Sequence, residues 1–132
     1  MPKPTLDVAL ALVQRGEQWL VAKRKRAAHL GGLWEFPGGK QQRDETATAA
    51  ALRELSEECG VDATPLRVLN VVRYEYEDRI VRITPVVCAW IAGEAQPLAA
   101  DECRWVTVDE LRRLAMPEVN AGIIRAALET PK

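Results

Sequence analysis

The sequence has few of the residues that build cross-linked or zinc-bound domains. Its three cysteines form no CxxC pair and no Cys/His ligand pattern, and His29 is the single histidine. An odd cysteine count without such spacing argues against a disulfide framework and against a structural zinc site. We therefore expect Cys59, Cys88 and Cys103 to be reduced thiols that are buried as small apolar side chains. A lone loop histidine is more often structural than catalytic, so we assign His29 to no site.

Long apolar runs and an excess of one charge are also absent. No apolar stretch reaches the roughly 20 residues of a membrane span, and the first ten residues, MPKPTLDVAL, lack a signal-peptide pattern. The formal net charge is −1, from 18 basic and 19 acidic residues. This balance argues against binding to duplex nucleic acid, which normally needs a basic surface. We therefore expect a cytoplasmic protein, either a monomer or a homodimer, that associates with no membrane and can still bind a small charged substrate.

What the sequence does contain is the composition of an ordinary globular domain. Of its 132 residues, 48% are apolar and 28% are charged, which predicts one domain spanning residues 1–132. Apolar runs bounded by turn residues predict strands at 6–13, 19–25, 33–36, 66–76, 80–92 and 104–108. Helix-forming residues predict a helix at 46–59, a capping box predicts a short helix that starts at Thr107, and Pro117 predicts the start of a last helix that runs to about 128. Pro85 suggests an edge strand or a bulge. Strands around a central helix, with helices at the end, predict an α+β (mixed α/β) layered domain.

Residues 39–61 are the most informative stretch. Gly39 is followed after five residues by Glu45, and after seven more by the run Arg53-Glu54-Leu55-Ser56-Glu57-Glu58-Cys59-Gly60-Val61. At ~100° per residue, the three carboxylates Glu54, Glu57 and Glu58 share one face of the predicted helix. Leu52, Leu55 and Cys59 form a stripe on another face. One side of the helix can thus pack on a sheet while the other presents oxygen atoms.

Three carboxylates on one helical face suit a divalent cation. Mg²⁺ prefers carboxylate and carbonyl oxygens and completes its shell with water and substrate phosphates, and Mn²⁺ can take its place. Arg53 lies one turn from Glu57 and can pair with it, and Glu45 is a second candidate partner. The alternative is an ordinary solvated charged face. The glycines and the arginine at fixed spacing favour the metal site.

This stretch resembles the Nudix box, G-x5-E-x7-R-E-U-x-E-E-x-G-U with U aliphatic, and all nine specified positions are filled. The flanking sequences at 34–40 (WEFPGGK), 74–79 (YEYEDR) and 117–124 (PEVNAGII) resemble the MutT-type branch. The resemblance implies an α/β/α sandwich with a central mixed sheet. It also implies hydrolysis of nucleoside triphosphates to a monophosphate and pyrophosphate, with oxidised purines such as 8-oxo-dGTP as the expected substrates.

The resemblance also implies roles for individual residues. The metal ligands would be the Gly38 carbonyl and the carboxylates of Glu54, Glu57 and Glu58, and Arg53 completes the catalytic set, with Glu45 supporting it. Either Glu54 or Glu57 would accept the proton of the attacking water. The substrate would contact Arg24, Phe36, Lys40, Asp78, Arg79 and Asn120, although Phe36 also suits a core and Asn120 a turn. A further acid before the last strand aligns with either Asp101 or Glu102, each of which also suits a solvated loop.

Three other functions remain open. Gly32-Leu33-Trp34-Glu35-Phe36 also resembles the lead-in of pyrimidine-selective, CTP-type pyrophosphohydrolases. A non-catalytic module that recognises oxidised bases is a second alternative, although such modules typically have a degraded box. Hydrolysis of ADP-sugars or dinucleoside polyphosphates is the third, because the box itself does not specify the leaving group.

Overall fold

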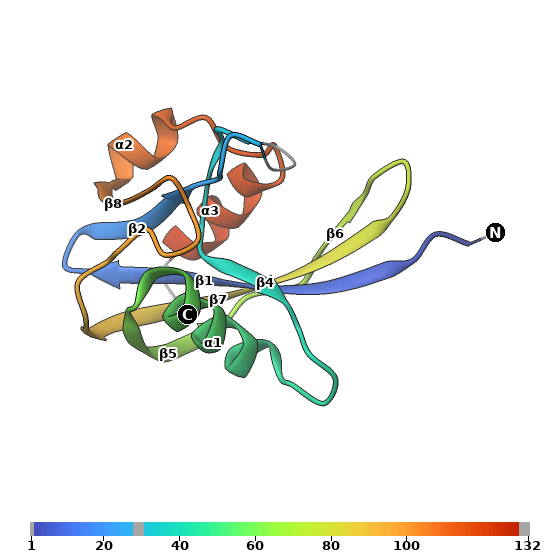
Figure 1. Cartoon of the computed structure of the whole chain (residues 1–132), viewed down its shortest axis with the longest axis horizontal. Helices are drawn as coiled ribbons and strands as arrows, with labels where there is room; N and C mark the ends of the chain where they lie inside the picture. The colour runs from blue at the N-terminus through green and yellow to red at the C-terminus, as the bar shows by residue number, and fades with distance from the viewer. Residues whose placement is uncertain (1, 28–30, 130–132) are drawn as a thin grey trace.

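The structure, a computed structural model, describes residues 2–27 and 31–129, so His29 lies outside it. A mixed sheet is covered on one face by α1 (Ala47–Cys59) and on the other by α2 (Val108–Arg113) and α3 (Asn120–Leu128) (Figure 1). The predicted α+β class and α/β/α layering are therefore confirmed. Among the described residues, no helix combines the length and apolar character needed to cross a membrane.

Two long parallel strands form the centre of the sheet. β1 (Thr5–Arg15) pairs with β7 (Ile80–Ala92), from Thr5 opposite Ile80 to Gln14 opposite Ala89. All other pairings are antiparallel. β1 also pairs with β2 (Gln18–Lys23) and β4 (Gly38–Lys40), and β2 also pairs with β3 (Trp34–Glu35) and β8 (Glu102–Thr107). On the other side, β7 pairs with β5 (Asp62–Val68) and β6 (Val72–Glu75). β4 thus brings the glycines alongside the central strand.

Alternation along β1 divides the core into two. Ala9, Ala11 and Val13 point to the face covered by α1, and all three are fully buried. Leu12 packs on the opposite face, with the residues that contact α2 and α3. Successive strand side chains point to opposite faces, so one buried strand supplies both cores. The small alanines let α1 lie close to the sheet.

The ends of α1 agree with the sequence prediction. The Thr46 side chain accepts a hydrogen bond from the Ala49 N–H at 3.0 Å, and Gly60 ends the helix in the left-handed conformation, with φ of 68°. The buried face differs in part from the predicted stripe, because Leu52 is only half-buried. Ala50 and Ala51 are fully buried beside Leu55 and Cys59. Alanine thus contributes more of this interface than the pattern of large apolar residues suggests.

The predicted single strand at 66–76 is wrong, since the chain forms β5 and β6 with a break at 69–71. Both pieces pair with β7, and Pro85 lies opposite the break, where its carbonyl accepts the Leu69 N–H at 2.9 Å. Proline has no N–H to donate to a ladder, so pairing is interrupted there. Of the two alternatives predicted for Pro85, the edge strand is wrong, because β7 is paired on both sides. The irregular pairing opposite Pro85 agrees with the other alternative, a bulge.

The helices after β8 follow the prediction in part. The capping box at Thr107 is present and begins α2. The last helix begins at Asn120 rather than Pro117, because Pro117 and the next two residues form a turn in which the Pro117 carbonyl accepts the Asn120 N–H at 2.9 Å. Asn120 is thereby the first residue of α3, and it is 4% exposed.

Candidate active site

The backbone of β4 lies against both the central strand and the box helix. A Cβ on Gly38 would lie 2.2 Å from the backbone oxygen of Ala9. On Gly39 it would lie 2.6 Å from the carboxyl carbon of Glu54. No side chain fits at either position without movement, so the two glycines allow a strand to pass directly beside a carboxylate.

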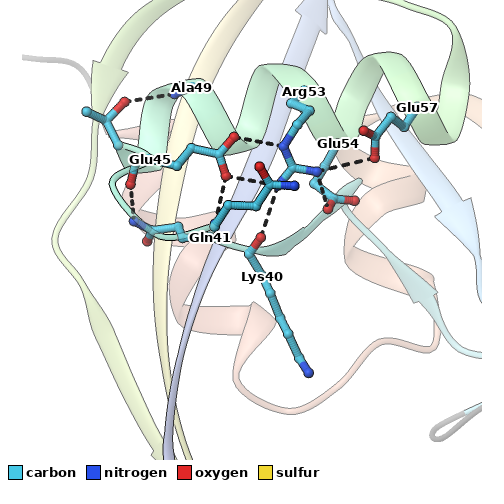
Figure 2. Close-up of polar contacts among 9 residues, drawn as sticks. Lys40, Gln41, Glu45, Ala49, Arg53, Glu54 and Glu57 are labelled. Carbon is cyan, nitrogen blue, oxygen red and sulfur yellow. Dashed lines mark hydrogen bonds and ion pairs between the residues drawn. The ribbon is translucent and has the colours of Figure 1, made fainter.

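Arg53 is the centre of the polar network in Figure 2. Its Nε and Nη2 donate to the two carboxylate oxygens of Glu45 at 2.7 and 2.9 Å, and Nη2 also donates to the Lys40 carbonyl at 3.1 Å. Its Nη1 donates to Glu54 at 3.0 Å and to Glu57 at 3.3 Å. Both predicted pairings of Arg53 are therefore present. The hydrogen bonds from Arg53 lower the pKa of Glu45 to about 2, so this pair remains charged at neutral pH.

The loop between β4 and α1 holds Glu45 in place. The Gln42 N–H donates to Glu45 Oε1 at 2.8 Å, and the Gln41 side-chain amide donates to the Glu45 carbonyl at 3.2 Å. Asp44 adopts the left-handed conformation, with φ of 65°, which turns the chain toward the helix. Glu45 therefore positions the guanidinium of Arg53, which in turn contacts two of the proposed metal ligands.

Glu58 lies on the inner side of the helix. Its Oε2 accepts the Gly38 N–H at 3.0 Å, and its carboxyl hydrogen-bonds to that of Glu54. Burial, with the adjacent Glu54 and the nearby Glu35 charge, raises the pKa of Glu58 to about 8. Without a cation, Glu58 therefore holds a proton at neutral pH. A divalent cation bound here would favour the ionised form of Glu58.

The box acids fit a hard divalent cation by donor type. Glu54 and Glu58 meet beside the glycines, whereas the Glu57 side chain is 59% exposed next to Arg53. Within residues 2–27 and 31–129, no three acidic, histidine or cysteine side chains converge on one point. The predicted ligands are carboxylate oxygens and a backbone carbonyl, and the described residues form no closed cage around them. Such open oxygen sites suit Mg²⁺, which retains waters and binds substrate phosphates.

A cleft of about 350 Å³ extends from the glycines of β4 toward α3. Its walls include five of the six residues predicted to bind substrate: Arg24, Phe36, Lys40, Arg79 and Asn120. The sixth, Asp78, is exposed in the turn before β7 and does not line this cleft. The apolar floor consists of Val8, Leu10, Val81 and Ile83 from the two central strands. One end of the cleft is thus polar and close to Glu54, and the rest can enclose an apolar ring.

Residues 8–126 match the NUDIX domain family. The chain is a Nudix hydrolase. It is 38% identical over 85 residues to an 8-oxo-dGTP diphosphatase of Proteus vulgaris, covering 64% of this chain and 76% of that protein. It is 36% identical over 78 residues to the CTP pyrophosphohydrolase of Escherichia coli strain K12, covering 59% and 58%. The fold matches that of a MutT NUDIX hydrolase from Burkholderia pseudomallei with a TM-score of 0.83 and 22% identity, covering 94% and 98%. The MutT-type resemblance is confirmed.

Glu35 is a cleft residue of this Nudix hydrolase that sequence reasoning did not assign to the site. It pairs with Arg24 at 2.8 Å, and burial raises its pKa while the hydrogen bond from Arg24 opposes that rise. Tyr76 was also missed. It lines the cleft, and the Arg79 guanidinium lies 5.4 Å from its ring centroid. The sequence does contain one indication of Glu35, because this charged residue stands between two aromatic residues, Trp34 and Phe36, that are buried.

The two candidates for an additional acid lie outside the cleft. Asp101 accepts the Arg26 N–H at 3.3 Å, and Glu102 forms an ion pair with Arg104. Neither lines the space beside the Nudix box, so the structure gives neither residue a contact with the proposed metal ligands. Their role stays a prediction.

Proposed function

We propose that this Nudix hydrolase cleaves (deoxy)nucleoside triphosphates to monophosphate and pyrophosphate with Mg²⁺ or Mn²⁺, and that it favours oxidised purines such as 8-oxo-dGTP. The observation that carries the proposal is the continuity of the cleft. It begins at Gly38 and Gly39, beside the Glu54 carboxylate, and reaches Phe36 and Asn120. A nucleotide needs both ends, an acidic centre for its metal-bound phosphates and an enclosed space for its base.

At the phosphate end, the cation ligands would be the Gly38 carbonyl, Glu54, Glu57 and Glu58. When bound, divalent cations screen the phosphate charge and polarise the phosphoryl oxygen and the attacking water. Arg53 donates hydrogen bonds to Glu54 and Glu57 and so orients both carboxylates, and either of them would accept the water's proton. The Lys40 side chain extends away from the Arg53 network and lines the cleft, so its ammonium suits a phosphate (Figure 2).

At the base end, Asn120 supplies both hydrogen-bond donors and an acceptor. Among the described residues, its amide has one hydrogen bond, from Nδ2 to the Met116 sulfur at 3.9 Å. A thioether is a weak acceptor, so most of the amide's bonding capacity is left for a base edge. Phe36 lines the cleft but is 1% exposed and packs in the core, so it would shape the wall rather than offer an open aromatic face. Arg24 and Arg79 supply cationic groups along the same wall.

The relatives support two substrates. Similarity to an 8-oxo-dGTP diphosphatase supports the purine, and similarity to a CTP pyrophosphohydrolase supports a pyrimidine-selective alternative. The same cleft also admits a smaller base. All four carboxylates of the box are present and in contact with Arg53 or with one another, which weighs against a non-catalytic recognition module.

A substrate panel tests the proposal. Purified protein with Mg²⁺ is mixed with normal and oxidised nucleoside triphosphates, CTP and 5-methyl-CTP, and the release of pyrophosphate and of orthophosphate is measured. We expect pyrophosphate, fastest from 8-oxo-dGTP, and none after chelation of the metal. Preference for the cytidine nucleotides would establish the alternative. No turnover of any triphosphate would overturn both.

Replacing Asn120 with alanine is expected to lower kcat/KM for the preferred purine by about 10- to 100-fold, since each good pair of hydrogen bonds to a base is worth about 1–3 kcal/mol. Turnover of CTP should change less. The matched control is Asn70→Ala, an exposed residue in the break between β5 and β6. Equal losses on purines and pyrimidines would contradict base recognition by Asn120, and melting temperatures would show whether the buried substitution has merely unfolded the protein.

A further inference from the structure

Two of the three thiols in this protein lie together. Cys59, Cys88 and Cys103 are all free; Cys59 and Cys88 are buried as predicted, whereas the prediction of burial is wrong for Cys103, which is partly exposed. The sulfur atoms of Cys59 and Cys103 are 3.6 Å apart, although 44 positions separate the two residues in the chain. The Cys88 thiol donates to the Val86 carbonyl at 3.4 Å and has no sulfur partner among the described residues. The fold therefore brings two thiols together, and Cys88, which lies apart from them, can serve as the control thiol in experiments.

The paired thiols differ in their accessibility. Cys59, the last residue of α1, is fully buried, whereas Cys103, near the start of β8, is partly exposed. The loop between β7 and β8 lies over this end of the helix. In that loop the Gln96 N–H donates to the Cys59 carbonyl, and the Leu98 N–H donates to the Glu58 carbonyl, both at 3.0 Å. A small oxidant from solvent therefore meets Cys103 first, with Cys59 directly behind it.

We propose that Cys59 and Cys103 form a reversible disulfide in response to a peroxide and that this bond lowers the activity of the enzyme. The Cys103 sulfur attacks one peroxide oxygen, the O–O bond breaks, and one water leaves, which gives a sulfenic acid. The Cys59 sulfur then attacks the Cys103 sulfur, the S–S bond forms and the S–O bond breaks. The departing hydroxide takes the remaining thiol proton and leaves as a second water. Two thiols are thus oxidised by two electrons, and one peroxide is reduced to two waters.

The disulfide would act on the site through α1. A disulfide bond measures about 2.05 Å, so the sulfur atoms must approach by roughly 1.5 Å. Side-chain rotation and the last turn of the helix absorb that movement. Glu58 immediately precedes Cys59, and its carboxyl accepts the Gly38 N–H. A displacement of about 1 Å in a catalytic constellation can cost up to ~100-fold in rate, so we expect a loss on the order of tenfold.

Mass spectrometry and thermal unfolding test the bond without reference to activity, so they remain informative even if the proposed substrate is wrong. Protein treated with hydrogen peroxide is expected to lose the mass of two hydrogen atoms and to yield a peptide linking Cys59 to Cys103. Its Tm should rise by about 5 °C, because the bond closes a long loop of the unfolded chain. A thiol reductant should reverse the change. The readout that rests on the proposed function is nucleotide turnover, which should fall on oxidation and recover on reduction.

Two variants sharpen the test. Cys103→Ser, at a partly exposed position, should show no linked peptide and no peroxide-dependent rise in Tm, and its turnover should resist peroxide. Cys88→Ser, if it folds, should behave as the wild type does, and Cys59→Ala provides a second version of the broken pair. Oxidation of wild-type protein only to sulfinic acid, or links involving Cys88, would overturn the proposed site. A linked peptide with unchanged turnover would overturn its regulatory effect.

Discussion

Glu57→Gln is expected to lower nucleotide turnover by about 100-fold or more while leaving the fold intact. Glutamine retains the size of the side chain but removes the negative charge that would hold the cation or accept the water's proton. Interactions of a catalytic cation are worth several kcal/mol, and each 1.4 kcal/mol of lost stabilisation lowers the rate tenfold. The Glu57 side chain is 59% exposed, and its contact with Arg53 is the longest of that network at 3.3 Å. Its loss should therefore cost little stability.

The measurement is kcat/KM with Mg²⁺ beside a melting curve for each protein. Glu17→Gln is the matched control, an exposed glutamate in the turn after β1 that does not line the cleft. It should retain full activity. Isothermal titration with Mn²⁺ should show weaker binding to Glu57→Gln only. Unchanged turnover in that variant would remove Glu57 from the metal site.

The local parts of this site could be predicted from the sequence. The helix, its capping residues and the pairing of Arg53 with Glu57 depend on residues within a few turns of each other. The pairing with Glu45 spans eight positions, and the motif fixes that spacing too. The single strand predicted at 66–76 failed for a different reason. The partner that interrupts it, Pro85, lies on another strand, and periodicity along one segment contains no information about the strand opposite.

The cleft residues also divide into those that the sequence indicates and those that only the fold reveals. Arg24, Phe36 and Asn120 were assigned because flanking sequences resemble a known family, whereas Glu35 and Tyr76 became visible only when the fold placed them in one cleft with Asn120. The pairing of Cys59 with Cys103 was likewise inaccessible. Their separation in the sequence matches no redox motif, and their contact depends on how α1 and β8 pack. Long-range proximity is a property of the fold rather than of any one segment.

Gly39→Ala is expected to lower turnover by about 100-fold with only a small change in stability. The added methyl group would lie 2.6 Å from the carboxyl carbon of Glu54, a contact that no protein tolerates without movement. The atom in the way belongs to the end of a flexible side chain, so Glu54 can rotate aside at low cost to folding. Its carboxylate would then leave the Arg53 network and the proposed metal site, and a displacement near 1 Å can cost up to ~100-fold in rate.

Substitutions at two other glycines separate this effect from general damage. In Gly38→Ala the methyl group would lie 2.2 Å from the backbone oxygen of Ala9, so β4 itself must move from β1. That variant should lose about 3 kcal/mol of stability or more, because overpacking against backbone has no cheap relief. Gly122→Ala, inside α3 with open space around the new methyl group, should gain about 0.5–1 kcal/mol and retain activity. If Gly39→Ala instead unfolds as readily as Gly38→Ala, Gly39 is needed for the stability of the fold rather than for the position of the Glu54 carboxylate. Loss of turnover at a nearly unchanged Tm would show that residue 39 must lack a side chain so that the Glu54 carboxylate can occupy its position in the site.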